Sequence, residues 1–100
     1  MTIFAPSDEA FSKLPEGTIE SLTITQKLDI FKRHIVPDTT VYAADVKTGK
    51  VKTLGGEKIF LIKAANEGVQ IYHNGNLVNV VKADVEASNG VIHVIDKVIL

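Results

Sequence analysis

The 100-residue sequence contains no cysteine and no tryptophan, and it has only one methionine and three prolines. The absence of cysteine excludes disulfide bonds and thiolate catalysis. Cysteine usage therefore does not indicate whether the protein works in an oxidising or a reducing compartment. None of the asparagines is followed two places on by serine or threonine, which excludes an N-glycosylation acceptor. The chain must therefore be stabilised by its own hydrophobic core, and its length is sufficient for one domain.

Long apolar runs and a strong excess of one charge are also missing. No apolar run approaches the roughly 20 residues that a membrane-spanning helix needs. Met1 is not followed by the charged region and long apolar stretch of a signal peptide. The net charge of −1 provides no broad attraction to nucleic acid or to an anionic membrane. We therefore expect no nucleic acid partner and no membrane insertion by this segment.

The motifs of common enzymes are absent as well. The sequence has no Gly-x-Ser-x-Gly nucleophile elbow and no glycine-rich phosphate loop. The histidines His34, His73 and His93 are not at spacings that would place two metal ligands side by side on one helix or strand. His73 precedes an Asn-Gly turn and is expected to be exposed, whereas His93 is expected to belong to a structural strand. These patterns predict no enzyme, no catalytic residue, no cofactor and no metal site.

Helix signals occupy the first third of the chain. Ser7 is a good N-cap and is followed by two acidic residues, which predicts a short helix over residues 8–14. A second helical turn is expected near Ile19 and Leu22. The clearest period predicts a helix over residues 25–35. Its apolar positions form one stripe that needs cover from the rest of the protein: Ile24, Leu28, Phe31 and Ile35.

The second half of the chain carries hairpin signals. Gly55-Gly56 and Asn74-Gly75 are turn pairs that accept positive φ, and residues 66–68 predict a further turn. The strands expected on either side of the two pairs are 51–54 with 58–62, and 69–73 with 76–80. Helices before a run of hairpins predict the α+β class, with a mostly antiparallel, twisted β-sheet and short helices packed at one end or face.

A last strand is predicted over residues 91–100, after a turn at residues 88–90. Side chains alternate between the faces of a strand, so His93 and Asp96 point in opposite directions and do not form a catalytic dyad. Neither face of this strand is polar throughout, which predicts cover on both sides for most of its length.

Three blocks of sequence carry a family resemblance. TIFAPSDEAF (residues 2–11) and NGVIHVIDKVIL (residues 89–100) resemble the two signature blocks of fasciclin-like domains, and FKRHIVPDTTV (residues 31–41) resembles the region around the central histidine of that family. The blocks occur in the family's order and at roughly its spacing, and the resemblance extends over the whole chain. The resemblance implies the fasciclin-like fold.

The resemblance also implies a function. Fasciclin-like domains are secreted or cell-surface modules of cell–cell and cell–matrix adhesion and are not known as enzymes. His34 matches the central histidine, and with Ile35 beside it is implied to take part in partner binding. Arg33 stands where the family usually has tyrosine. Asp84-Val85 stands where many members carry an Asp-Ile pair implicated in integrin recognition. A hydroxyl of the first block, from Thr2 or Ser7, is the implied partner of the central histidine.

Two surfaces are candidates for partner binding. Asp84, Val85 and Glu86 are expected in a loop before the last strand, where they are either simply solvated or form a recognition site whose aspartate completes the oxygen shell of a receptor-bound metal. Lys50 and Lys52 are expected on one face of a strand. They either protect and solubilise a sheet edge or form a site for acidic polysaccharide, which is the alternative function.

The resemblance finally implies a single domain over residues 1–100 that lacks the family's N-terminal helices, because members begin some tens of residues earlier. The apolar stripe near residues 24–35 would then lose part of its cover. Each uncovered large aliphatic side chain forfeits about 1.5–3 kcal/mol. We therefore expect either a marginally stable fold or self-association through the uncovered face.

Overall fold

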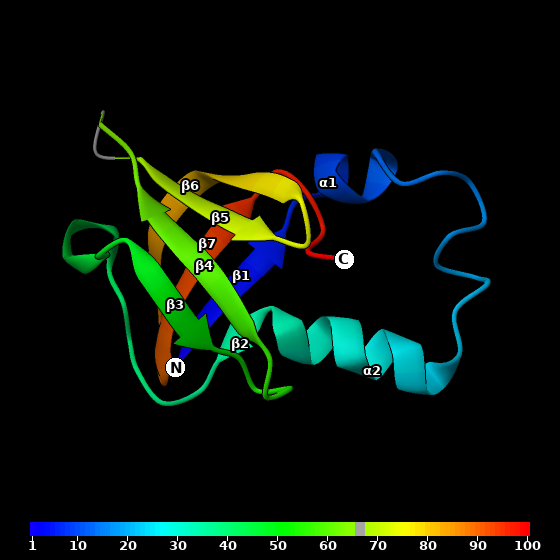
Figure 1. Ribbon diagram of the computed structural model, residues 1–100, viewed down its shortest axis with the longest axis horizontal. Coiled ribbons are helices and arrows are strands. Elements are labelled where there is room, and N and C mark those ends of the chain that lie inside the picture. The colour runs from blue at the N-terminus through cyan, green and yellow to red at the C-terminus, as the bar shows by residue number, and fades with distance from the viewer. Residues whose placement is uncertain (66–67) are drawn as a thin grey trace.

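A computed structural model describes residues 1–65 and 68–100 of the chain. In these residues the chain forms a seven-stranded sheet, two α-helices and one 3-10 helix (Figure 1). The helical elements are α1 (Asp8–Ser12), α2 (Ile24–Arg33) and η1 (Ala43–Asp45). The strands are β1 (Thr2–Pro6), β2 (Ile35–Val36), β3 (Gly49–Lys52), β4 (Lys58–Lys63), β5 (Val69–His73), β6 (Asn76–Ala87) and β7 (Gly90–Ile95).

The strand order across the sheet is β2-β1-β7-β6-β5-β4-β3. The first and last strands of the chain lie side by side and are parallel, with Thr2 opposite Val91 and Pro6 opposite Ile95. All other neighbouring strands are antiparallel. The two hairpins expected around residues 55–56 and 74–75 are therefore confirmed, and Asn74 and Gly75 both have positive φ.

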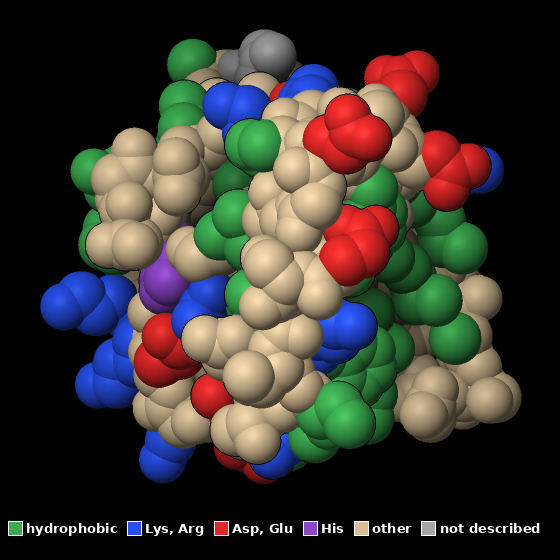
Figure 2. Space-filling model, turned by 90° about the vertical axis from the view of Figure 1, so that its right-hand side faces the viewer, with side chains coloured by type: hydrophobic (Ala, Val, Ile, Leu, Met, Phe, Trp, Pro, Cys, Tyr) green, Lys and Arg blue, Asp and Glu red, His purple; other side chains and the backbone are tan. Residues whose placement is uncertain are grey.

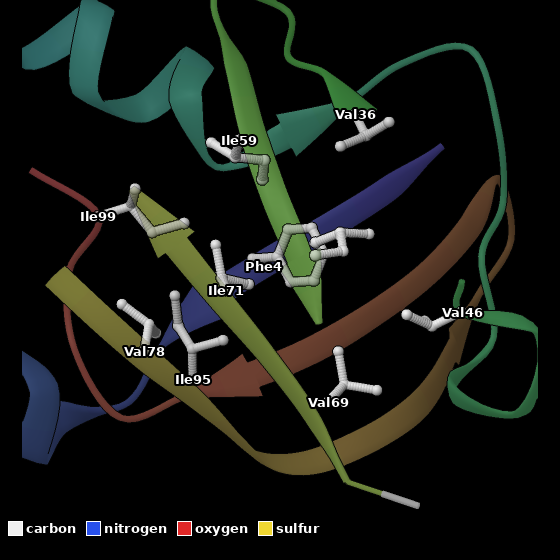
Figure 3. Packing of buried hydrophobic residues seen from close by; sticks show 10 residues of the cluster. Phe4, Val36, Val46, Ile59, Val69, Ile71, Val78, Ile95 and Ile99 are labelled. Atoms are coloured by element: carbon white, nitrogen blue, oxygen red, sulfur yellow. The ribbon is translucent and has the colours of Figure 1, made fainter. Parts of the chain in front are cut away.

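The long strand β6 bends the sheet around the core. Its first half pairs with β5 and its second half pairs with β7, and the register with β7 shifts at two places after Val80. Such bulges increase twist and turn one part of a sheet toward another. In Figure 3, Phe4 and Ile95 from β1 and β7 point toward Ile59 and Ile71 from β4 and β5. These four side chains are at most 2% exposed, so the core lies between the two halves of the sheet.

Side-chain caps mark where both α-helices begin. Ser7 accepts a hydrogen bond from the backbone N–H of Ala10, and Thr23 forms a capping box with Gln26 at the start of α2. Residues 15–22 form successive turns, as three backbone hydrogen bonds show. Residues 19–22 therefore belong to hydrogen-bonded turns and do not form the helical turn that the sequence predicted.

Several other boundaries differ from the prediction, and β3 spans Gly49–Lys52 rather than residues 51–54. Helix α1 ends at Ser12 rather than at residue 14, and Ile35 lies in β2 rather than in the helix. The last strand ends at Ile95, where the chain turns away, so residues 96–100 are not strand. The face of β7 with His93 is buried and the face with Val94 is half-buried, so the predicted cover is complete on the first face and partial on the second. Residues 66 and 67 of the expected turn at 66–68 lie outside the described residues.

Candidate functional site

Asp84 lies within β6, not in the loop that the sequence predicted. Lys82 pairs with Val94 and Val85 pairs with Ile92, so β6 has one extra residue between these pairs. Asp84 occupies this bulge with a φ of 61°, a left-handed conformation that aspartate and asparagine tolerate better than most residues. The bulge places its carboxylate on the surface, where the Asp84 side chain is 43% exposed.

Internal hydrogen bonds hold the bulge in place. Asp84 Oδ1 accepts from the Ala43 backbone N–H at 2.8 Å, and the Asp84 N–H donates to His93 Nδ1 at 3.2 Å. His93 Nε2 lies 2.7 Å from the Val41 carbonyl oxygen. A carbonyl only accepts and an N–H only donates, so His93 Nδ1 is the acceptor of this pair of bonds and Nε2 is the donor. The ring also stacks on Phe4 at a centroid distance of 5.6 Å.

His93 is therefore a structural histidine, as the sequence predicted. It is 2% exposed, and it ties the bulge of β6 to the segment before η1. Asp96 has other partners, because its two carboxylate oxygens accept from the backbone N–H and the side-chain amide of Asn79 at 2.8 and 3.1 Å. The two residues do not contact each other as a dyad.

The neighbours of Asp84 extend the surface. Glu86 is exposed and Val85 is half-buried, and Tyr42 lies beside them with its hydroxyl 3.5 Å from Glu86 Oε1. Within the described residues, Asp84 Oδ2 makes no hydrogen bond. The residues of this surface, which we call the bulge surface, are Tyr42, Asp84, Val85 and Glu86. Tyr42 was not predicted, because its proximity depends on how residues 37–45 pack against β6.

His34 caps the C-terminal end of α2 and is 5% exposed. Its Nδ1 lies 2.7 Å from the Ile30 carbonyl oxygen, and its Nε2 accepts from the Ile99 N–H at 2.9 Å. By the same donor and acceptor rule, this ring is neutral with its proton on Nδ1. Burial lowers the pKa of His34, the Ile30 hydrogen bond raises it less, and the charges of Arg33 and His73 lower it further.

The hydroxyl partner expected for His34 is wrong. Thr2 Oγ1 donates to the Thr39 carbonyl and accepts from the Val41 N–H, and Ser7 caps α1. The first block instead contacts this region through its backbone, since the Phe4 N–H donates to the His34 carbonyl at 2.8 Å. The backbone amide of Ile99 replaces the hydroxyl because residues 96–100 fold back against the end of α2.

An apolar groove of about 380 Å³ separates α2 from β1 and α1. His34 and Ile35 are both buried and line its wall. Figure 2 looks onto this end of the molecule, where hydrophobic side chains gather. The other residues of the groove include Ile3, Phe11, Ile19, Leu22, Ile30 and Phe31. A role of His34 and Ile35 in partner binding would require a partner that enters this groove, and it stays a prediction.

A polar cluster that sequence reasoning missed holds the C-terminal segment. Arg33 pairs with Glu57 through its Nε and donates from a terminal nitrogen to the Ile99 carbonyl. His73 Nδ1 lies 3.1 Å from the Leu100 carbonyl oxygen and its Nε2 lies 3.4 Å from Glu57. Partial burial would raise the pKa of Glu57, but the Arg33 hydrogen bond and charge, together with His73, lower it. His73 has a side chain that is only 15% exposed, so its predicted exposure is wrong.

Lys50 and Lys52 are exposed on β3, which forms one edge of the sheet. Val51 between them packs against the core, so the two lysines share the outward face, as predicted. In the described part of the chain, no group of three or more His, Asp or Glu side chains is arranged to hold a metal ion. Neither described α-helix is long and apolar enough to cross a membrane.

Comparison with known proteins identifies the family. The family model for the fasciclin domain matches residues 1–100. The chain belongs to the fasciclin domain family. The family that the three sequence blocks suggested is thus confirmed.

Two relatives show how much of a longer protein a fasciclin domain of this kind occupies. Protein sll1483 of Synechocystis is 45% identical over 103 residues, which cover 99% of this chain and 54% of that protein. The transforming growth factor-beta-induced protein ig-h3 of Sus scrofa is 36% identical over 106 residues, which cover 98% of this chain and 14% of that protein. The chain therefore spans about half or less of the length of these two relatives.

A solved structure confirms the fold. The FAS1 domain pair of the insect cell adhesion molecule Fasciclin I matches with a TM-score of 0.74 and 22% identity, over 98% of this chain and 36% of that one. The α+β class, with a mostly antiparallel sheet and short helices, is confirmed by this match and by the strand order.

Proposed function

We propose that this fasciclin domain is an extracellular or cell-surface adhesion module that binds a matrix protein or a cell-surface receptor through the bulge surface. The observation that carries the proposal is the exposed Asp84 carboxylate, held at a fixed place by a bulge and by its bond to Ala43. Support for adhesion as the general role comes from the family, since one structural relative belongs to an insect cell adhesion molecule.

The chemistry of the bulge surface suits a receptor that carries a metal ion, such as an integrin-like receptor. A carboxylate oxygen is the ligand that Ca²⁺ and Mg²⁺ prefer. Asp84 Oδ1 is used by the Ala43 N–H, so Oδ2 is the oxygen that would complete the shell of the partner's ion. Val85 and Tyr42 provide half-buried apolar surface beside it.

The proposal includes no reaction and no cofactor. Both ring nitrogens of each buried histidine bond to the backbone. His34 bonds to Ile30 and Ile99, and His93 bonds to Val41 and Asp84. A general base needs a nitrogen that reaches a substrate proton. The buried rings of His34 and His93 are occupied on both sides.

Replacement of Asp84 by asparagine tests the receptor site. Asparagine also tolerates positive φ and retains an oxygen that accepts from the Ala43 N–H. The Asp84→Asn variant is therefore expected to unfold at the same temperature as the parent, while metal-dependent attachment of cells to the immobilised domain drops about tenfold or more, because the neutral amide binds a cation poorly.

Glu16→Gln is the matched control, because it removes one negative charge from an exposed residue that lies outside the bulge surface. It is expected to retain most of the attachment. If Asp84→Asn supports attachment as well as the parent does, the bulge surface is not the receptor site. Loss of attachment in both variants to the same degree would assign the effect to net charge and would also contradict the proposal.

A further inference from the structure

The outward face of β3, β4, β5 and the first half of β6 presents a continuous row of side chains. Its members are in direct register across four strands: Lys50 opposite Phe60, Phe60 opposite Tyr72, and Tyr72 opposite Leu77. The alternate residues Ile59, Leu61, Ile71 and Val78 are buried in the core. The row therefore points away from the core, and Tyr72 and Leu77 are 45% and 42% exposed.

A second pair adds charge to the row. Lys52 and Lys58 are directly opposite each other on the same outward face. The Cβ atoms of directly opposite residues lie about 4.5–5.5 Å apart, and two like charges in such a pair repel each other and destabilise the sheet. If these lysines served only to keep the sheet edge soluble, an acidic residue in place of one of them would make the pair more stable. The repulsion is relieved when an anion lies between the two ammonium groups.

Acidic side chains do not neutralise this face from within its strands. The residues of β3, β4 and β5 include four lysines and neither aspartate nor glutamate. The nearest acid in the sequence, Glu57, pairs instead with Arg33 and His73 near the end of α2. Lys63 reaches the Ala43 carbonyl on the inward side, which leaves Lys50, Lys52 and Lys58 on the outward face. Figure 2 shows Lys and Arg side chains gathered along the left-hand edge of the molecule.

We propose that this outward face binds an acidic polysaccharide. Carboxylate or sulfate groups of the polymer would pair with Lys50, Lys52 and Lys58, and the apolar C–H face of a sugar ring would pack on Tyr72, beside Phe60. The row from Lys50 to Leu77 spans three strand spacings, about 14 Å, which provides room for more than one sugar unit. The site is distinct from the bulge surface, because it is formed by β3–β5 and the first half of β6.

The alternation of charge with an aromatic ring favours a polysaccharide over nucleic acid. Binding to nucleic acid depends mostly on many cationic contacts with its phosphates. Three lysines on a chain with a net charge of −1 provide few such contacts. An acidic polysaccharide carries its charges on rings with apolar faces, so it would use both parts of the row.

Titration of the chain with three polymers tests the site: heparin as the sulfated probe, polygalacturonate as the carboxylated probe and dextran as the neutral one. Binding to at least one acidic polymer, weakened by salt, and none to dextran are expected. The Lys52→Gln/Lys58→Gln variant should bind about tenfold more weakly, and its thermal stability should not fall, because a repulsion has been removed. Tyr72→Ala should also weaken binding several-fold, whereas Tyr72→Phe should retain it.

The matched control is Lys27→Gln/Lys97→Gln, which removes the same charge from α2 and the C-terminal segment. It should bind like the parent. Equal weakening by the control, or unchanged binding by the Lys52→Gln/Lys58→Gln variant, would overturn the site. Single-stranded DNA is the probe for binding that depends on charge alone. If it binds as tightly as the acidic polymers and Tyr72→Ala has no effect on binding, the polysaccharide assignment is wrong. Because Asp84 is unchanged in all of these variants, their failure would leave the adhesion proposal standing.

Discussion

At the scale of single residues, His34 links the end of α2 to the C-terminal segment. Its neutral ring donates to Ile30 and accepts from the Ile99 N–H, and both Ile99 and His34 are buried. A protonated ring would carry a second N–H where the acceptor for Ile99 is needed. The folded state therefore favours the neutral ring, in agreement with the lowered pKa of His34, which burial causes first.

We predict that His34 makes stability depend on pH. The folded pKa lies below the ordinary value of 6.5, so the unfolded chain binds more protons in the interval between the two values. The stabilisation is fully present above about pH 6.5 and is lost as the pH falls through the folded pKa. His34→Leu leaves the Ile99 N–H without an acceptor and should cost about 1–3 kcal/mol at pH 8, measured by urea unfolding.

The same measurement at pH 5.5 provides the test of titration. The difference in unfolding free energy between the parent and His34→Leu should be smaller there, because the parent has lost part of its stabilisation. His34→Gln is the control: its amide keeps both a donor and an acceptor, so it should lose less stability at pH 8. A difference that is the same at both pH values would contradict a role for protonation of His34.

At the scale of elements, the pairing of β1 with β7 depends on Gly90. A Cβ atom at this position would lie 1.9 Å from the Met1 carbonyl oxygen. That oxygen accepts from the Val91 N–H at the start of the parallel pair. Because backbone atoms on both sides cannot move without separating the strands, an alanine here must disturb the first bonds between β1 and β7.

We predict that Gly90→Ala destabilises the fold by more than about 1 kcal/mol, through steric contact with the backbone. Thermal unfolding measures the loss, and hydrogen exchange of the Val91 amide localises it. Gly49→Ala is the control, since a Cβ on Gly49 in β3 would meet nothing within 4 Å. A Gly90→Ala variant as stable as Gly49→Ala would show that the close approach of Met1 is relieved at no cost.

At the scale of the whole molecule, the apolar side of α2 is uncovered. Ile24, Leu28 and Phe31 of the predicted stripe are 78%, 50% and 62% exposed, and Ile35 alone is buried, in β2. Helix α2 extends away from the sheet (Figure 1) and has no buried residue. Exposed apolar patches of this kind mark sites of association.

We predict that the chain self-associates through α2 as its concentration rises. Sedimentation over a concentration series should show this, and the melting temperature should rise with concentration because association stabilises the folded state. Leu28→Gln/Phe31→Gln should weaken association without a large loss of monomer stability, because both side chains are already half exposed or more.

Val81→Gln is the control for hydrophobicity elsewhere, since Val81 is 60% exposed on β6. It should associate like the parent. A parent chain that stays monomeric at high concentration and unfolds cooperatively at one temperature would show that α2 needs no cover, and the prediction of self-association would be wrong.

Features that depend on residues adjacent in the sequence were predicted most reliably. The Asn74-Gly75 turn, the Ser7 cap and the outward lysines of β3 were predicted correctly, because each depends on the conformational preference or alternation of adjacent residues. Element ends were less reliable. The last strand was predicted to run to residue 100 but ends at Ile95, because the pairing of β7 with β1 and β6 stops there.

What the sequence alone determined about this protein is its class, its hairpins, its family and the outward direction of Lys50 and Lys52. What only the tertiary structure decided is which distant residues meet. Asp84 meets Ala43, Ile99 supplies the partner of His34, and Lys50 joins a row that ends at Leu77. The reason is physical: turns, caps and alternation arise from neighbours along the chain, whereas bulges, strand register and the path of the C-terminal segment arise from packing between residues far apart in it.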